Sequence, residues 1–212
     1  MKIHSFTLST ILLTVFLIQQ IESKEMVKKP NVILFLIDDL GWSDLSLTGS
    51  KFHETPNVDR LAREGAFFSD AYAASSVCSP SRASILTGQN PARHGMTSPA
   101  AHLPEVRLEV IAQTRGVPHQ KSCNLKTATR IRKEVPTLGE ILKDNGYQTA
   151  HFGKWHLAND MIPDSPPPSD YGFDVSAAFN CSGKQMPVHE DARRTVDFIE
   201  SSHAEGTPFY VN

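Results

Sequence analysis

Cysteine is scarce in this chain. It occurs only three times in 212 residues, as Cys78, Cys123 and Cys181. No Cys-x-x-Cys pair and no cluster of cysteine with histidine is present, which argues against a zinc site of the usual pattern. The odd number leaves at least one thiol outside any disulfide within the chain, so one cysteine is left over.

An excess of charge of either sign is also lacking. Lys and Arg number 21 against 23 Asp and Glu, which gives a formal net charge of −2. Proteins that bind nucleic acid usually carry a basic surface, so this balance argues against nucleic acid as an obligatory partner. With 40% hydrophobic and 21% charged residues, the composition is typical of a globular protein with one sizeable core.

No apolar run is long enough to span a membrane, which takes about 20 residues. The run at residues 11–18 is shorter; it follows Lys2 and His4 and precedes Ser23, a small residue suited to cleavage. This layout predicts a signal peptide over residues 1–23, with an uncleaved anchor as the alternative. We therefore expect a secreted, periplasmic or lysosomal-type protein, in which residues 24–29 form a short charged linker.

Strands and helices alternate along the rest of the chain. Residues 31–37 form a continuous apolar run, typical of a strand buried on both faces of a parallel sheet. The predicted elements are strand 31–37, helix 55–65, strand 66–68, helix 80–86, helix 137–146, strand 147–152, helix 188–202 and strand 209–211. The alternation predicts an α/β fold with a mostly parallel sheet sandwiched by helices.

Two other stretches complete this outline. Residues 98–133 lack periodicity and are rich in basic side chains, so we expect a long loop or an insertion there. The last predicted strand runs to the end of the chain at Asn212, and we therefore expect the domain to be truncated.

An acidic pair, Asp38-Asp39, directly follows the first predicted strand. Open α/β sheets bind ligands beyond the carboxyl ends of their strands. Successive strand side chains point to opposite faces, so the chain must turn for both carboxylates to meet one ion, and Gly41 permits a turn. Hard oxygen ligands suit Ca²⁺ or Mg²⁺. The alternative is a helix cap or a pair of solvated loop acids.

The segment Cys78-Ser79-Pro80-Ser81-Arg82 combines a thiol with an arginine. Pro80 favours a helix start, which places Cys78 near a helix N-terminus, where anions bind well. Arg82, one turn later, can direct its guanidinium at the same place. These residues predict an anion site that contains a thiol. The alternative is a buried cysteine beside a surface arginine.

A third cluster, Gly153-Lys154-Trp155-His156, follows the strand predicted at residues 147–152. Lys154 and His156 therefore also lie near the end of a strand. Two donors this close in sequence fit an anion site, but a capped strand with surface charges fits equally well.

Together these segments resemble the type I sulfatases of the alkaline phosphatase superfamily. The run from Cys78 to Arg82, with Thr87-Gly88 behind it, resembles the family's first signature, and residues 146–156 resemble the second, although Phe152 is less usual there. Residues 31–41 and 55–62 are similar to the family's opening strand with its metal pair and to the next helix. The resemblance implies an alkaline-phosphatase-like fold, with residues 30–212 as the N-terminal part of a sulfatase catalytic domain.

The resemblance implies a modified nucleophile at Cys78. In the family, a maturation enzyme oxidises this cysteine to formylglycine, whose hydrate is a geminal diol. One diol oxygen takes the sulfuryl group, and deprotonation of the other reforms the aldehyde and expels sulfate. Carried over, Asp38 and Asp39 are ligands of a divalent cation, usually Ca²⁺, that also touches the formylglycine.

The resemblance also assigns roles to three further side chains. Arg82 matches the arginine that steadies the formylglycine, and Lys154 matches the lysine that bridges the nucleophile and the sulfate oxygens. His156 matches the histidine that helps to deprotonate the diol. The implied activity is hydrolysis of a sulfated small molecule or glycan. The alternatives are a formylglycine-dependent phosphonate or phosphodiester hydrolase and an inert truncated pseudoenzyme.

Some features fall outside these roles. Family members carry a later Asp-Asn metal pair, a later histidine and lysine, and a smaller C-terminal domain, so we expect the isolated chain to be inactive. With Cys78 modified, Cys123 and Cys181 pair with each other or with cysteines elsewhere. Asn180 begins an Asn-Cys-Ser glycosylation pattern. His94 lies near the pocket or caps a turn.

Overall fold

The computed structural model describes residues 29–100, 105–112, 119, 125–158, 165–180 and 188–212. The chain divides into two units, residues 1–30 and residues 31–212, and the second contains all the elements described below. The predicted signal peptide and linker, together with Cys123 and Cys181, lie outside the described residues. No described helix is both long and apolar enough to cross a membrane.

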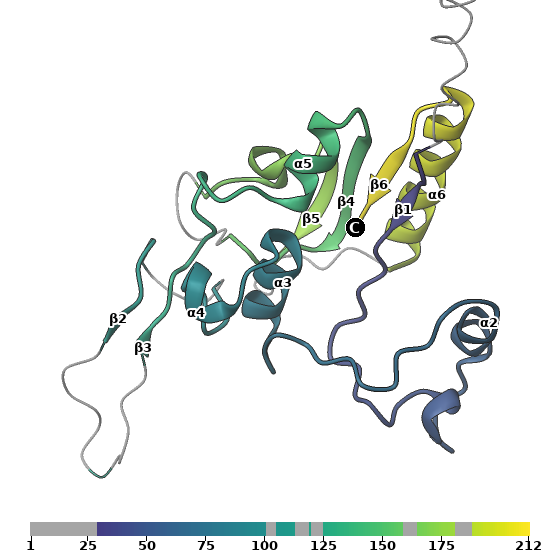
Figure 1. Cartoon of the computed structure of the whole chain (residues 1–212), viewed down its shortest axis with the longest axis horizontal. Coiled ribbons are helices and arrows are strands. Elements are labelled where there is room, and N and C mark those ends of the chain that lie inside the picture. The colour runs from purple at the N-terminus through teal and green to yellow at the C-terminus, as the bar shows by residue number, and fades with distance from the viewer. Residues whose placement is uncertain (1–28, 101–104, 113–118, 120–124, 159–164, 181–187) are drawn as a thin grey trace, which may run out of the picture. The chain divides into compact units, whose positions relative to one another are not determined.

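The centre of the second unit is a parallel sheet of four strands in the order β1-β6-β4-β5 (Figure 1). The strands are β1 (Val32–Ile33), β4 (Gln148–Lys154), β5 (Val175–Phe179) and β6 (Phe209–Val211). Tyr210 is paired with Val32 on one side and with Thr149 on the other. The predicted mostly parallel α/β sheet is thus confirmed.

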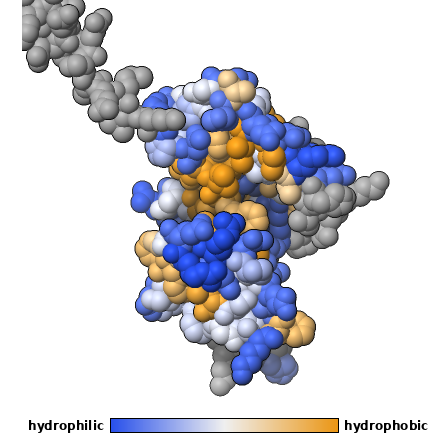
Figure 2. All heavy atoms as spheres, turned by 90° about the vertical axis from the view of Figure 1, so that its right-hand side faces the viewer, coloured by the Kyte–Doolittle hydropathy of each residue, from blue (hydrophilic) through white to orange (hydrophobic). Residues whose placement is uncertain are grey.

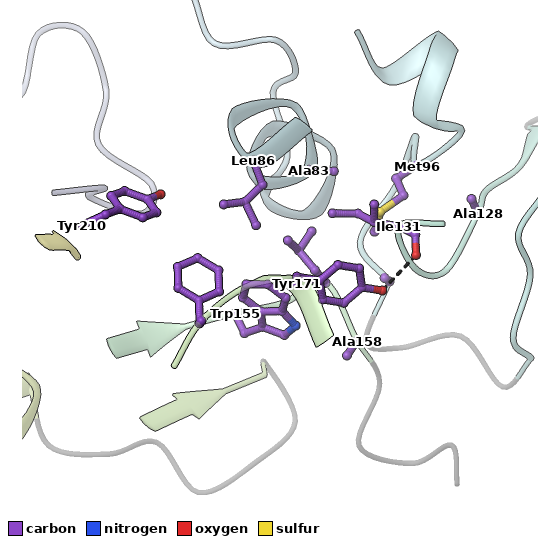
Figure 3. Close-up of a cluster of buried hydrophobic side chains, with 12 residues drawn as sticks. Ala83, Leu86, Met96, Ala128, Ile131, Trp155, Ala158, Tyr171 and Tyr210 are labelled. Atoms are coloured by element: carbon purple, nitrogen blue, oxygen red, sulfur yellow. Dashed lines mark hydrogen bonds between the residues drawn. The ribbon is translucent and has the colours of Figure 1, made fainter. Parts of the chain in front are cut away.

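Helices cover both faces of this sheet. Tyr210 of β6 packs into a core with α3 (Cys78–Thr87) and α5 (Leu138–Asp144), while its neighbours Phe209 and Val211 pack on the opposite face, against α6 (Val188–Ala204). Because successive strand side chains point to opposite faces, this alternation separates the two cores. In the first core, the Tyr171 hydroxyl donates to the Ile131 carbonyl at 2.9 Å (Figure 3).

Local sequence signals explain where the helices begin and end. Thr137 and Glu140 form a capping box at the start of α5, where a helix was predicted from residue 137. Gly88 ends α3 in a left-handed conformation, φ 65°, that favours glycine. Predicted helix 55–65 appears as α2 (Pro56–Glu64). The remaining elements are η1 (Ser46–Thr48), α4 (Pro91–His94), β2 (Ile111–Ala112), β3 (Leu125–Lys126) and η2 (Pro168–Tyr171).

Two predicted strands need correction, and one strand was not predicted. The strand predicted at residues 66–68 is wrong: the segment pairs with no described strand, and Phe68 is 77% exposed. Only residues 32–33 of the strand predicted at 31–37 form β1, which lies at the edge of the sheet, and Phe35 is 83% exposed. Strand β5 was missed, because its small side chains give a weak strand signal. Within residues 98–133, β2 and β3 form an antiparallel pair.

Candidate active site

Three of the predicted site residues meet at the carboxyl ends of the parallel strands. Asp38, which follows β1, accepts a hydrogen bond from Lys154 Nζ at Oδ2 (2.5 Å). Its Oδ1 accepts a hydrogen bond from Arg82 Nη2 (3.1 Å). We call Asp38, Arg82 and Lys154 the ionic cluster. It joins residues 44 and 116 positions apart, at the edge where α/β sheets bind ligands.

The first turn of α3 is fixed against the segment 154–156 by two further hydrogen bonds. Ser79 Oγ donates to the His156 carbonyl at 2.6 Å, and Arg82 Nη1 donates to the Lys154 carbonyl at 2.5 Å. Both acceptors are main-chain oxygen atoms. The two sulfatase-like segments are therefore in direct contact, and α3 begins at Cys78 beside them. The sequence patterns did not reveal the part played by Ser79.

Cys78 is a free, half-buried thiol at the first position of α3. The preceding Val77 has no side chain that can cap the helix, so its N-terminal N–H groups are not satisfied by an N-cap side chain. The N-terminus of a helix favours negative charge through these N–H groups. This placement agrees with the expected anion site.

Two site residues have unusual backbone geometry. Asp39 and His156 adopt left-handed conformations with φ of 56° and 54°, and His119 is the one other described non-glycine residue with positive φ. Such conformations are costly for residues other than glycine and are concentrated at functional sites. Gly153, just before Lys154, has φ 104°, where a side chain would be strained.

Burial and charge shape the electrostatics of the ionic cluster. The side chains of Arg82 and Lys154 are 9% and 17% exposed, and that of Asp38 is 34% exposed. Burial alone would raise the pKa of Asp38, but hydrogen bonds from Lys154 and Arg82 lower it below its ordinary value. Asp38 is therefore held as a carboxylate, and the cluster keeps one net positive charge, which favours an anion.

His156 is buried and held through its backbone. Its N–H donates to Asn180 Oδ1 at 2.8 Å, while its carbonyl accepts from Ser79. Asn180 directly follows β5, so a third strand end contributes to the site. Asn180 is only 4% exposed, which argues against the glycosylation suggested by its Asn-Cys-Ser pattern. Because β5 was not predicted, no sequence pattern indicated this contact.

His94 caps a turn, one of the two alternatives considered for it. Its Nδ1 accepts from the backbone N–H of Met96 at 3.1 Å, and its Nε2 lies 3.0 Å from Ser84 Oγ. With Nδ1 accepting, Nε2 carries the proton and donates to Ser84. Burial lowers the pKa of His94, which favours this neutral form. The histidine thereby joins α4 to α3.

A cavity of about 650 Å³ adjoins the ionic cluster. Asp38, Arg82 and Lys154 line it, whereas Cys78 and His156 do not. Its apolar wall includes Ile33, Leu34, Phe35, Leu36 and Ile37. Figure 2, which faces the side of β1 and α6, shows this apolar surface. The predicted residues thus meet around α3 without sharing one cavity.

The oxygen atoms at this strand end are of the chemical type that binds a divalent cation. Asp38 and Asp39 supply hard carboxylate oxygens at a strand end, as Ca²⁺ or Mg²⁺ requires. No group of three or more His, Cys, Asp or Glu side chains suited to a metal occurs among the described residues. Ca²⁺ takes six to eight oxygen ligands, so this pair could hold only part of its coordination sphere.

Comparison with known proteins identifies the family. The family model described as "Sulfatase" matches residues 30–197. The chain belongs to the sulfatase family. The chain is 31% identical to mouse N-acetylgalactosamine-6-sulfatase over 217 aligned residues, which cover 86% of the chain but only 38% of the mouse enzyme.

Solved structures agree in fold. The crystal structure of Ps i-CgsB in complex with k-i-k-neocarrahexaose matches with a TM-score of 0.65 and 25% identity, over 86% of the present chain and 44% of the Ps i-CgsB chain. Another, solved with its substrate D-glucosamine-2-N,6-O-disulfate, matches with a TM-score of 0.62 and 25% identity, over 87% and 33% of the two chains. The alkaline-phosphatase-like α/β fold expected from the sequence is confirmed.

Proposed function

We propose that the complete protein carrying this chain hydrolyses sulfate esters, with formylglycine at position 78 as nucleophile and Ca²⁺ bound in part by Asp38 and Asp39. The observation that supports this most directly is the ionic cluster. A carboxylate from one strand end holds an arginine and a lysine beside the N-terminus of α3. Membership of the sulfatase family supports the reaction type.

In this proposal Arg82 steadies the formylglycine, and Lys154 bridges the nucleophile and the sulfate oxygens. The hydrogen bonds to Asp38 and to the Lys154 carbonyl fix Arg82 before substrate arrives. Lys154, also held by Asp38, presents its ammonium group to the sulfate oxygens. Cations fixed in advance stabilise developing negative charge without reorganising, which is usually the largest catalytic term.

His156 takes the role of a base. Backbone bonds to Asn180 and from Ser79 hold its main chain, so the left-handed conformation is maintained. We propose that the imidazole accepts the proton whose loss from the hydrated residue 78 releases sulfate. Ca²⁺, when bound, supplies positive charge that lowers the pKa of the nucleophile and neutralises sulfuryl oxygens.

We propose a sulfated sugar as substrate, reached after export by the signal peptide. Mouse N-acetylgalactosamine-6-sulfatase and the structure with D-glucosamine-2-N,6-O-disulfate support this class. The basic segment 98–133 adds little support, because two of its described basic side chains are already held in ion pairs. Arg107 pairs with Glu105, and Lys133 pairs with Asp170 at 2.7 Å.

The experiment expresses the complete protein together with a formylglycine-generating enzyme. Mass spectrometry of the peptide spanning residues 76–82 should show an aldehyde in place of the thiol. Sulfate release from a chromogenic aryl sulfate should then exceed turnover of the matching phosphodiester. Preference for the phosphodiester would favour the phosphonate or phosphodiester hydrolase, and an unmodified thiol would contradict the proposed nucleophile.

A further inference from the structure

A second, much smaller cavity lies beneath the ionic cluster, between α3 and β4. Its volume is about 10 Å³, and its lining includes Arg82, Leu86, His151 and Trp155. A cavity holds one water molecule when roughly 10–15 Å³ of it is open to the centre of a water-sized sphere. A buried water typically makes about three hydrogen bonds. The space therefore suits a single water if its walls offer polar partners.

The walls do offer such partners. Arg82 Nε and both ring nitrogens of His151 are buried without a hydrogen-bond partner among the described residues. Trp155 Nε1 is a fourth such atom in the lining. A buried polar group left unsatisfied costs roughly 1–3 kcal/mol, more if it is charged. Unpartnered nitrogens on both sides of a water-sized space are therefore a sign that something bridges them.

His151 is an unusual residue for its surroundings. It lies on β4, is 3% exposed, and makes edge contacts with the rings of Trp155 and Phe173 at 5.0 and 5.5 Å. An apolar side chain would satisfy this packing without leaving polar atoms buried. The histidine is therefore explained better by a polar partner than by packing.

The two side chains are chemically complementary. Burial, and secondarily the charge of Arg82, lower the pKa of His151 to about 4, so the ring is neutral near pH 7. The nearby backbone of Gly153 and Lys154 raises the pKa of His151 and so offsets part of this lowering. Neither backbone makes a hydrogen bond of normal geometry with the ring. A neutral imidazole has one acceptor nitrogen, whereas a guanidinium has donors only.

We propose that His151 is a positioning residue for Arg82. A water in the small cavity accepts the hydrogen bond from Arg82 Nε–H and donates one to the acceptor nitrogen of His151. Since Nη1 and Nη2 already bind the Lys154 carbonyl and Asp38, this bridge occupies all three guanidinium nitrogens and fixes the plane of the group. The consequence for catalysis rests on the proposed function, in which Arg82 steadies the formylglycine.

The test compares three variants of the complete protein. His151→Leu removes the acceptor and fills the position with an apolar side chain, whereas His151→Gln retains an acceptor. Phe198→Leu disturbs the opposite face of the sheet, where Phe198 contacts Phe209, and serves as a matched packing control. We expect kcat/KM to fall on the order of tenfold in His151→Leu and to stay within about twofold in the other two, since tenfold corresponds to 1.4 kcal/mol.

A second readout does not depend on activity. The ¹⁵Nε–¹H signal of Arg82 should exchange slowly with water in the unaltered protein, faster by about tenfold or more in His151→Leu, and slowly again in His151→Gln and Phe198→Leu. Equal exchange rates in the unaltered protein and His151→Leu would overturn the proposal, as would a His151→Gln variant that behaves like His151→Leu. If His151→Leu does not fold, fast exchange of this signal in the unaltered protein would overturn it equally.

The two readouts separate the two proposals. If the protein has no sulfatase activity but the Arg82 signal responds as expected, the proposed function fails and the positioning role stands. If activity is present and the signal does not respond to His151→Leu, the positioning role fails and the proposed function stands.

Discussion

Helices α2 and α3 have nearly the same length, 9 and 10 residues, but contrast in burial. Helix α3 buries five residues, including the charged Arg82, while α2 buries none and leaves Leu61 69% exposed. Both start near a proline and end at a glycine. The comparison teaches that local signals determine where a helix forms, whereas polar side chains that reach other segments determine how firmly it is held.

The same contrast extends to the segments around the helices. We refer to residues 78–100 and 148–156 together with β5 as the α3 region, and to residues 31–75 as the β1–α2 region. The first holds Cys78, Lys154 and His156 within a bonded framework. The second contributes Asp38, whose two ionic hydrogen bonds are a main link between the regions.

The largest loss of activity is expected from a substitution that removes the nucleophile of the α3 region and leaves the fold of that region unchanged. Cys78→Ala should lower sulfate release from an aryl sulfate by at least about 10³-fold, because loss of a covalent nucleophile removes a whole reaction path. Since the Cys78 thiol makes no hydrogen bond or disulfide with any described residue, the thermal midpoint should stay within ~2 °C. Activity within tenfold of the unaltered enzyme would contradict the proposed role.

The next largest loss of activity is expected when the carboxylates that the β1–α2 region contributes to the site are removed. Asp38→Ala with Asp39→Ala should lower activity by about 10²-fold or more and weaken Ca²⁺ binding in calorimetric titration, since two carboxylate ligands are lost. Chelation with EDTA should inhibit the unaltered enzyme similarly. Circular dichroism is the control, because removing Asp38 also leaves Arg82 and Lys154 without their carboxylate. Undiminished activity in a folded double variant would rule out the metal role.

A matched pair of helix variants tests the comparison directly. Leu86→Ala in α3 should lower the free energy of unfolding by about 3 kcal/mol, as usual for a buried leucine. Leu61→Ala in α2 should change it by less than about 0.5 kcal/mol, because that side chain is exposed. Denaturant unfolding of residues 30–212 measures both values. A large effect of Leu61→Ala would show that α2 has a packed face after all.

The smallest effect concerns the ionic link itself. Because the pKa of folded Asp38 lies below its ordinary value of 3.8, its stabilising contribution is present above pH 4 and is lost as the pH falls through the folded pKa. The side chain is about one third exposed, so the contribution should be at most about 1 kcal/mol. The stability difference between the unaltered protein and Asp38→Asn should therefore shrink between pH 6 and pH 3. A constant difference would contradict the link.

Sequence patterns predicted much of this molecule because several signals are local. The capping box at Thr137, the glycine after α3 and the apolar run of β6 each specify an element from a few neighbouring residues. The meeting of Asp38, Arg82 and Lys154 could also be expected, because strand ends in a parallel sheet share one edge.

The failures have physical reasons too. Residues 66–68 have strand-like composition, but a strand requires a partner, which composition does not reveal. Strand β5 combines small side chains with a position at the edge of the sheet, where none of its residues is fully buried. The contacts of Ser79 with His156, and of Asn180 with His156, join residues 77 and 24 positions apart. No local pattern encodes such contacts, and the same is true of His151 beneath Arg82.

The two bonds that dock α3 onto the segment 154–156 end on carbonyl oxygens. Every amino acid has a carbonyl oxygen, so replacing Lys154 or His156 does not delete the acceptor. The identity of the reactive groups and the placement of the helix can therefore change independently during evolution or in the laboratory. Libraries that vary positions 154 and 156 should sample new chemistry on an unmoved scaffold, provided that Ser79 and Arg82 are retained.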